Sequence, residues 1–166
     1  MKKGTIILLC CLVLPSVINA KEIEVGFSKT GIALDIILNA INQAKKDIHV
    51  AAYKFKSTNI SVALIAAKKR GVIVKMLIDK GANTPQSNAL KTLKNNQVEI
   101  CLTDHYAHMH NKFMIIDNNT VQTGSFNYNA SAAKRNAENV IVINNKDVAN
   151  TYQQEFNRLY NECLTG

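Results

Sequence analysis

From residue 22 onward, strand-like segments alternate with helix-like segments, and no linker, repeat or low-complexity tract interrupts them. Alternating or continuous apolar runs predict strands over Glu22–Phe27, His49–Phe55, Val72–Ile78, Val98–Leu102, Lys112–Asp117, Thr120–Thr123 and Asn139–Ile143. Apolar residues at helical spacing predict helices over Ile32–Ala44, Ile60–Lys69, Asn88–Lys94, Asn129–Lys134 and Lys146–Leu164. The Asn118-Asn119 turn makes one strand pair antiparallel. The pattern predicts one α/β domain, residues 21–166, with a mixed, mostly buried β-sheet and helices on both faces.

Residues 1–20 have the pattern of a signal peptide. Lys2 and Lys3 precede an unbroken apolar run, Ile6–Leu14, and the small residue Ala20 closes the segment. The run is shorter than the roughly 20 residues that span a bilayer. We therefore expect export to the periplasm or the extracellular space, without stable membrane insertion after cleavage. An uncleaved N-terminal anchor is the alternative.

The chain is basic, with a formal net charge of +8. The first twenty residues hold two lysines and no acidic residue, so the mature chain would carry +6. Such an excess favours polyanionic partners, either nucleic acid or an anionic membrane surface, without choosing between them.

Cys101 and Cys163 are the cysteines of the expected mature chain. In an oxidising compartment the two could pair, but their spacing matches no disulfide framework or zinc site. Each could equally be a small buried apolar residue. The sequence leaves the question open.

One short stretch concentrates the polar side chains that suit phosphate chemistry. His110 and Lys112 are two residues apart at a predicted strand and project to the same side, whereas Phe113 faces the core. A glycine then permits a tight turn that presents Ser125 and Asn127 as neutral hydrogen-bond donors. Together these groups are suited to binding the non-bridging oxygens of a phosphate.

The same groups suit attack on a phosphodiester. A neutral imidazole can attack phosphorus and form a covalent intermediate, which splits one difficult step into two easier ones. Lys112 and Asn127 are placed to stabilise the charge that develops in the transition state. A carboxylate on the far ring nitrogen of His110 would fix the tautomer, and Glu138 is the candidate.

The spacing H-x-K-x4-D-x6-G-S-x-N, from His110 to Asn127, resembles the motif of the phospholipase D superfamily. The chain is most similar to its smallest members, the secreted bacterial endonucleases that carry a single copy. The resemblance extends over roughly Val25 to Tyr160 and includes the segments Val25–Ser28, Ala51–Phe55, Ala66–Gly71 and Thr123–Asn127.

The resemblance implies a role for each motif position. His110 would be the nucleophile that forms a phosphohistidine, and Glu138 would orient its ring. Lys112 and Asn127 would bind the phosphate, with Ser125 supporting the network. The family's reaction implies no cofactor and no metal ion.

Asp117 also belongs to the motif and is counted among the catalytic candidates, although the resemblance implies a more structural role, with which its place at the end of a strand agrees. Larger relatives bring two copies of the motif together, so that one histidine attacks and the other protonates the leaving oxygen. His49, His105 and His108 have no lysine two residues on, so this chain holds one copy. The resemblance therefore implies a symmetric homodimer with the active site at the twofold interface.

Two further sets of residues near the motif need an interpretation. Lys134 and Arg135 are candidates for contacts to the phosphate backbone of the substrate. His108 and His110, with Asp104 and His105, could also be read as a metal cluster, but the carboxylates of a two-metal nuclease are missing. We therefore expect no metal site.

The leading hypothesis is a metal-independent phosphodiesterase, a sequence-nonspecific secreted endonuclease that cleaves DNA, with RNA as a further candidate substrate. Nothing resembles a base-reading helix, so contacts should go mainly to phosphates. The alternative is a phospholipase D that converts phosphatidylcholine to phosphatidic acid with the same catalytic group. Against it, the chain has no Trp and no second amphipathic membrane segment. A third reading is a non-catalytic, basic nucleic-acid-binding module.

Overall fold

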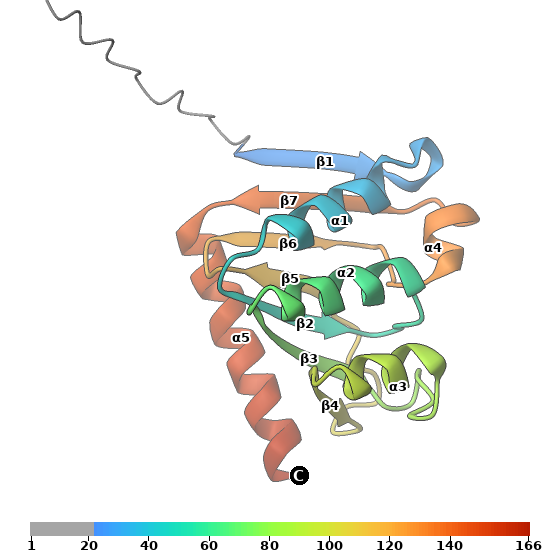
Figure 1. Ribbon diagram of the computed structural model, residues 1–166, viewed down its shortest axis with the longest axis vertical. Helices are drawn as coiled ribbons and strands as arrows, with labels where there is room; N and C mark the ends of the chain where they lie inside the picture. The colour runs from blue at the N-terminus through green and yellow to red at the C-terminus, as the bar shows by residue number, and fades with distance from the viewer. Residues whose placement is uncertain (1–21) are drawn as a thin grey trace, which may run out of the picture.

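The computed structural model describes residues 22–166, so the expected signal peptide, residues 1–20, lies outside the described residues. The described residues form a seven-stranded sheet in the order β1-β7-β6-β5-β2-β3-β4 (Figure 1). The strands are β1 (Ile23–Phe27), β2 (Asp47–Ala52), β3 (Ile73–Asp79), β4 (Glu99–Thr103), β5 (Lys112–Ile116), β6 (Thr120–Gly124) and β7 (Asn139–Asn144). The β2–β3 and β3–β4 pairs are parallel and the other pairs antiparallel, which confirms the predicted mixed sheet.

Helices cover both faces of this sheet, as the sequence predicted. They are η1 (Ser28–Thr30), α1 (Ile32–Gln43), α2 (Thr58–Lys69), α3 (Asn88–Asn95), α4 (Ala130–Lys134) and α5 (Lys146–Thr165). Figure 1 shows α1 and α2 side by side on one face, while the long helix α5 crosses the other. Within residues 22–166, no helix combines the length and the apolar character that crossing a membrane requires.

Strand β5 illustrates why the sheet is buried on both sides. Its side chains alternate between faces, so Met114 and Ile116 join the apolar cluster under α1 and α2. Phe113 and Ile115 join the second cluster, under α5. The continuous apolar run in the sequence is therefore a central strand with a core on each side.

The strand directions bring distant segments of the sequence to one edge of the sheet. Ala52, the last residue of β2, pairs with Lys112, the first residue of β5. Strand β6 ends at the same edge, where Thr123 pairs with Phe113, and β7 begins there. The segments after β2, β3 and β6 therefore meet the segments before β5 and β7.

Gly124, the glycine of the motif, is required where β6 ends. Its φ angle is +145°, and a Cβ atom at this position would overlap the backbone carbonyl oxygen of Asn139. That same oxygen accepts the backbone N–H of Ser125 at 3.2 Å. The glycine thus allows β6 and β7 to approach closely and fixes the position of Ser125.

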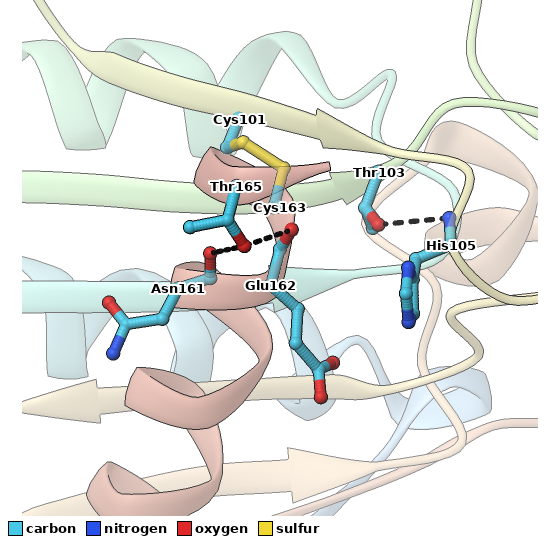
Figure 2. The surroundings of a disulfide bond; sticks show 7 residues. All are labelled: Cys101, Thr103, His105, Asn161, Glu162, Cys163 and Thr165. Carbon is cyan, nitrogen blue, oxygen red and sulfur yellow. Dashed lines mark hydrogen bonds between the residues drawn. A yellow bond between two sulfur atoms is a disulfide. The ribbon is translucent and has the colours of Figure 1, made fainter.

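A disulfide joins Cys101 of β4 to Cys163 in the last turns of α5 (Figure 2). The two Cα atoms are 6.3 Å apart, and 62 residues separate the cysteines in sequence. The question that the sequence left open is therefore answered by a bridge between the edge strand and the C-terminal helix.

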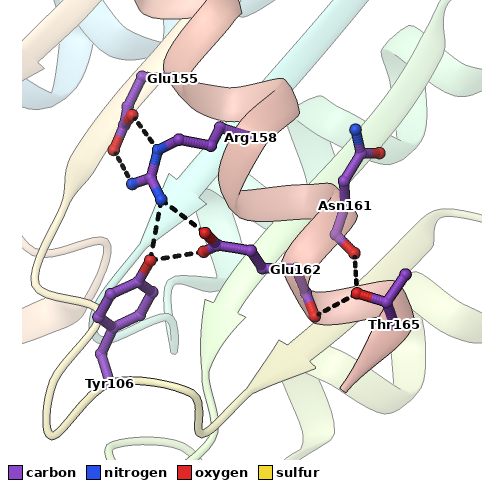
Figure 3. A network of polar contacts seen from close by, with 6 residues as sticks. All are labelled: Tyr106, Glu155, Arg158, Asn161, Glu162 and Thr165. Atoms are coloured by element: carbon purple, nitrogen blue, oxygen red, sulfur yellow. Dashed lines mark hydrogen bonds and ion pairs between the residues drawn. The ribbon is translucent and has the colours of Figure 1, made fainter.

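A polar network attaches the same end of α5 to the loop that leads toward His110 (Figure 3). The Tyr106 hydroxyl donates to Glu162 at 2.5 Å, and Arg158 pairs with Glu155 and Glu162, each at 2.7 Å. The hydrogen bond from Tyr106 and the charge of Arg158 lower the pKa of Glu162. This loop is thus held by both the network and the disulfide.

Candidate active site

His110 and Lys112 lie side by side at the edge where β5 begins. The Lys112 Nζ is 3.2 Å from the His110 Nδ1 and donates to the His110 carbonyl oxygen at 2.7 Å. His110 is exposed, whereas Lys112 is only 9% exposed. The structure therefore brings together the imidazole and the ammonium that the motif spacing predicted.

The surroundings shift both groups toward their neutral forms. Burial lowers the pKa of Lys112 and the charge of Lys54 lowers it further, although Glu138 opposes both effects. Desolvation and the charge of Lys112 lower the pKa of His110. A lowered pKa keeps more of the imidazole neutral, which is the form that can act as a nucleophile.

Tyr53, which follows β2, packs directly against this pair. Its ring centroid is 4.3 Å from that of His110 and 5.7 Å from that of His108. The Nζ atoms of Lys54 and Lys112 lie 5.4 and 5.3 Å from the centroid of the same ring. In the sequence, Tyr53 stands within a segment that resembles the family, but no spacing marks it as a site residue.

Two polar residues near the end of β3 hold the site loops together. Asp79 is 2% exposed and accepts the backbone N–H of Met109 at 2.8 Å. Asn83 accepts the N–H of Phe55 at 2.8 Å and donates to the carbonyl oxygen of Tyr53 at 2.5 Å. These bonds fix the residue before His110 relative to the loop that carries Tyr53. No sequence spacing connects Asp79 or Asn83 to the motif, so neither was predicted.

Ser125 and Glu138 form a second polar group at the same edge. The Ser125 Oγ donates to Glu138 Oε2 at 2.5 Å, and Asn136 Nδ2 donates to Oε1 at 2.8 Å. The Glu138 backbone N–H donates to the buried Ser28 Oγ at 2.9 Å. Because these donors occupy its carboxylate, Glu138 makes no hydrogen bond to His110 within the described chain. The predicted orienting contact is thus absent from the single protomer.

Asn127 lies in a segment that crosses the start of β5. This segment leaves β6 and reaches the loop after β2, where the Tyr128 carbonyl oxygen accepts the N–H of Lys56 at 2.8 Å. The order β6-β5-β2 places that crossing over the edge that carries His110. The Asn127 Oδ1 is buried without a hydrogen-bond partner among the described residues. Because this oxygen is an acceptor, a contact from Asn127 to a phosphate oxygen would have to come from its Nδ2 group, and Asn127 stays a candidate on the motif spacing.

Asp117 lies at the opposite end of β5, away from the other motif residues. Its carboxylate accepts the backbone N–H groups of Lys45 at 2.9 Å, Lys46 at 2.7 Å and Asp47 at 3.1 Å. Its own φ angle is +55°, in the turn between β5 and β6. The structure therefore does not bring Asp117 to the site, and its contacts give it a structural function.

We expect Asp117→Ala to lower the free energy of unfolding by about 2 kcal/mol, because several charge-assisted hydrogen bonds are lost. Activity measured well below the melting temperature should be retained. Thermal melting and steady-state kinetics would check both. The matched control is Asn119→Ala, a change at an exposed position of the same turn. A large loss of kcat in folded Asp117→Ala protein would contradict the structural role.

Lys134 and Arg135, at the end of α4, are exposed. Arg135 bonds to Ser131 Oγ at 2.9 Å. The alternative metal cluster is not formed either, since Asp104 pairs with Lys80 at 2.5 Å. In the part of the chain that the structure describes, no three His, Cys, Asp or Glu side chains are grouped to hold a metal ion.

Comparison with known proteins identifies the family. Residues 37–160 match the family described as "Cardiolipin synthase, PLD-like domain". The chain belongs to the phospholipase D superfamily. A Rickettsia bellii protein named phospholipase D is 36% identical over 141 residues, 85% of this chain and 70% of its own length.

Two other relatives extend the comparison. A solved phospholipase D family member, Nuc from Salmonella typhimurium, superposes with a TM-score of 0.80 at 36% identity, covering 84% of this chain and 93% of Nuc. A mitochondrial cardiolipin hydrolase of Xenopus tropicalis is 25% identical over 148 residues, 89% of this chain and 70% of that protein. The protein is therefore a phosphodiesterase of the phospholipase D superfamily.

Proposed function

We propose that this phospholipase D superfamily member is an exported, metal-independent endonuclease that cleaves DNA without sequence preference. The observation that carries the proposal is the exposed His110 imidazole, held 3.2 Å from the Lys112 ammonium in a chain whose expected mature form carries a net charge of +6. A reactive nitrogen and a phosphate-binding cation thus share one accessible edge. The similarity to Nuc over 93% of that chain supports a single-domain enzyme of this kind.

In the first half-reaction, a ring nitrogen of neutral His110 attacks the phosphorus atom. A nitrogen–phosphorus bond forms and the bond from phosphorus to the leaving oxygen breaks. Lys112 and Asn127 bind the non-bridging oxygens, where one prearranged donor is typically worth about 3 kcal/mol. The product is a phosphohistidine and a free hydroxyl end of the nucleic acid.

The leaving oxygen needs a proton, and a homodimer supplies it. With the two copies of His110 facing each other across a twofold axis, the protonated second imidazole donates to the leaving oxygen. The same imidazole then takes a proton from water, whose oxygen attacks phosphorus and breaks the nitrogen–phosphorus bond. This restores His110 and releases a phosphomonoester end.

The dimer also provides a role for Glu138 that the single protomer lacks. Glu138 makes no hydrogen bond to His110 of its own chain, although it lies close enough to raise the pKa of Lys112. In this dimer, a lone pair that Ser125 and Asn136 leave free on the Glu138 carboxylate of one protomer would accept from the imidazole of the other. There it would hold the ring tautomer, as the sequence analysis expected of Glu138.

Export is supported by two features of the chain. The N-terminal segment has a basic start, an apolar run and a small residue at its end, as signal peptides do. The disulfide between Cys101 and Cys163 is of a kind that persists in oxidising compartments.

The test is digestion of plasmid DNA in the presence of EDTA. We expect wild-type protein to retain its nuclease activity after chelation, because the proposed nucleophile is a side chain rather than a metal-bound water. A parallel reaction with added Mg²⁺ is the control. If cleavage is lost in EDTA and restored by the metal, the histidine mechanism is wrong.

The second candidate function is hydrolysis of phosphatidylcholine to phosphatidic acid. It is favoured by the Rickettsia relatives that bear the name phospholipase D. The same attack on phosphorus serves both reactions, since only the substituents of the diester differ. Phosphatidylcholine vesicles assayed beside plasmid DNA, with equal enzyme, separate the two functions.

A further inference from the structure

Two adjoining hollows lie beside Tyr53, the residue that packs against His110. The first has a volume of about 650 Å³ and is lined by residues that include Tyr53, Lys54, Lys56 and Ser131. The second, of about 220 Å³, is lined by residues that include Lys56 and Lys134. Lys56 and Ala130 line both hollows, so the two adjoin, and Tyr53, which packs against His110, lines the first of them. We call the two adjoining hollows the basic groove.

The three lysines of the basic groove lack partners of opposite charge. Lys54, Lys56 and Lys134 are exposed, and none of them forms an ion pair within residues 22–166. No carboxylate lines either hollow. Exposed lysines without an ion pair within residues 22–166 also lie elsewhere, Lys45, Lys91 and Lys94 among them, so what distinguishes the groove is that its lysines line hollows without a carboxylate. The groove therefore gathers positive charge that the protein itself does not neutralise.

This charge is continuous with the reactive groups. The Lys54 Nζ lies 5.4 Å from the centroid of the Tyr53 ring, which packs against His110 on the same edge. Lys54 also lowers the pKa values of His110 and Lys112 through its charge. A bound anion in the groove would reduce the electrostatic repulsion between Lys54 and the protonated forms of His110 and Lys112.

We propose that Lys54, Lys56 and Lys134 bind the phosphates that flank the scissile phosphate of a nucleic-acid strand, an inference that rests on the proposed nuclease function. A nucleic-acid strand carries an anion at every nucleotide, so its neighbouring phosphates reach cations beyond the catalytic pair. Phosphatidylcholine has one phosphodiester and offers nothing anionic to a row of lysines. The groove thus favours a polymeric polyanion over phosphatidylcholine.

The test compares the triple variant Lys54→Gln, Lys56→Gln, Lys134→Gln with a control of equal charge change. The control is Lys45→Gln, Lys91→Gln, Lys94→Gln, at exposed positions outside both hollows. The substrates are a fluorescent single-stranded oligonucleotide and the small diester bis(para-nitrophenyl) phosphate. For each, kcat/KM is measured across a series of salt concentrations.

We expect the groove variant to lose roughly tenfold more kcat/KM on the oligonucleotide than on the small diester. Its log–log salt slope on the oligonucleotide should fall in magnitude by about two units relative to the control, since three phosphate contacts are removed. The contrary result is that the groove variant and the control variant show the same salt slope and the same ratio of kcat/KM on the oligonucleotide to kcat/KM on the small diester. In that case the groove inference is wrong while the nuclease proposal stands.

Two other outcomes are equally decisive. Wild-type protein that hydrolyses the small diester but not the oligonucleotide would overturn both the nuclease proposal and the groove's substrate. If the groove variant instead loses hydrolysis of phosphatidylcholine vesicles and keeps oligonucleotide cleavage, the groove serves lipid and the inference is overturned.

Discussion

His110→Asn is expected to lower kcat for plasmid cleavage by at least about four orders of magnitude, as removal of a covalent nucleophile does in other hydrolases. Asparagine retains a polar group beside Lys112 but has no nitrogen that can attack phosphorus. The matched control is His108→Asn. His108 is exposed and meets the edge of Tyr53 rather than Lys112, so its replacement should leave most of the activity. Similar losses in the two variants would contradict a nucleophilic role for His110.

The same variant tests the proposed dimer. When wild-type and His110→Asn chains are refolded together in equal amounts, random pairing leaves about one quarter of the dimers with two histidines. If both histidines are needed, total activity should be about one quarter of that of the same amount of wild-type protein. Independent sites would instead give about one half. Sedimentation of the mixture checks that the assembly is a dimer, and an active monomer would overturn the arrangement.

The elements of the fold were predictable because each one carries its own periodic signal. Strand β5 reads as an apolar run, and α5 carries apolar residues at helical spacing. The boundaries were less well predicted where a local contact decides them. Helix α2 begins at Thr58 rather than Ile60, because the Ser57 side chain accepts the Ile60 N–H at 3.3 Å and caps the helix.

The end of β2 was also predicted incorrectly, and this boundary matters because the loop after it carries Tyr53 to the active site. The sequence predicted a strand through Phe55, whereas β2 ends at Ala52. Beyond Ala52, the Asn83 side chain forms hydrogen bonds with the backbone of Tyr53 and Phe55. These bonds hold the segment in a loop instead of a continued strand. Asn83 lies 30 residues from Tyr53 in sequence, so no local pattern could reveal this contact.

In the active site, the motif spacing predicted that His110 and Lys112 lie together, but it did not predict the residues that contact them. His110 and Lys112 are close because they flank the start of one strand, a relation that two-residue spacing encodes. Tyr53 and Asp79 reach the same edge only because β2 and β3 run parallel and end there. The hydrogen-bond partners of the Glu138 carboxylate could not be predicted either, because Ser125 and Asn136 come close to it only when β6 and β7 pair.

The disulfide was left open by the sequence because a separation of 62 residues carries no information about geometry. In the fold, β4 lies at the edge of the sheet, and α5 crosses behind it so that Cys163 reaches Cys101. The bridge thus depends on the packing of the C-terminal helix, which no spacing rule describes.

Removing this disulfide is expected to have the second largest effect, on stability rather than on chemistry. Closing a loop of 62 residues removes chain entropy from the unfolded state, which corresponds to about 4 kcal/mol in the loop-closure estimate. Cys101→Ser with Cys163→Ser should therefore lower the free energy of unfolding by about that amount. For a chain of this size, that corresponds to a decrease of roughly 8–16 °C in melting temperature.

Reduction provides the control for this prediction. Dithiothreitol should lower the stability of wild-type protein to that of the double variant and should leave the double variant unchanged. Because Tyr106 also binds Glu162 near the bridge, the loop toward His110 keeps one of its two attachments to α5. Activity at low temperature should thus survive reduction while heat resistance is lost. A reduced wild-type protein as stable as the oxidised one would show that helix packing alone holds α5, and would remove the bridge as support for export.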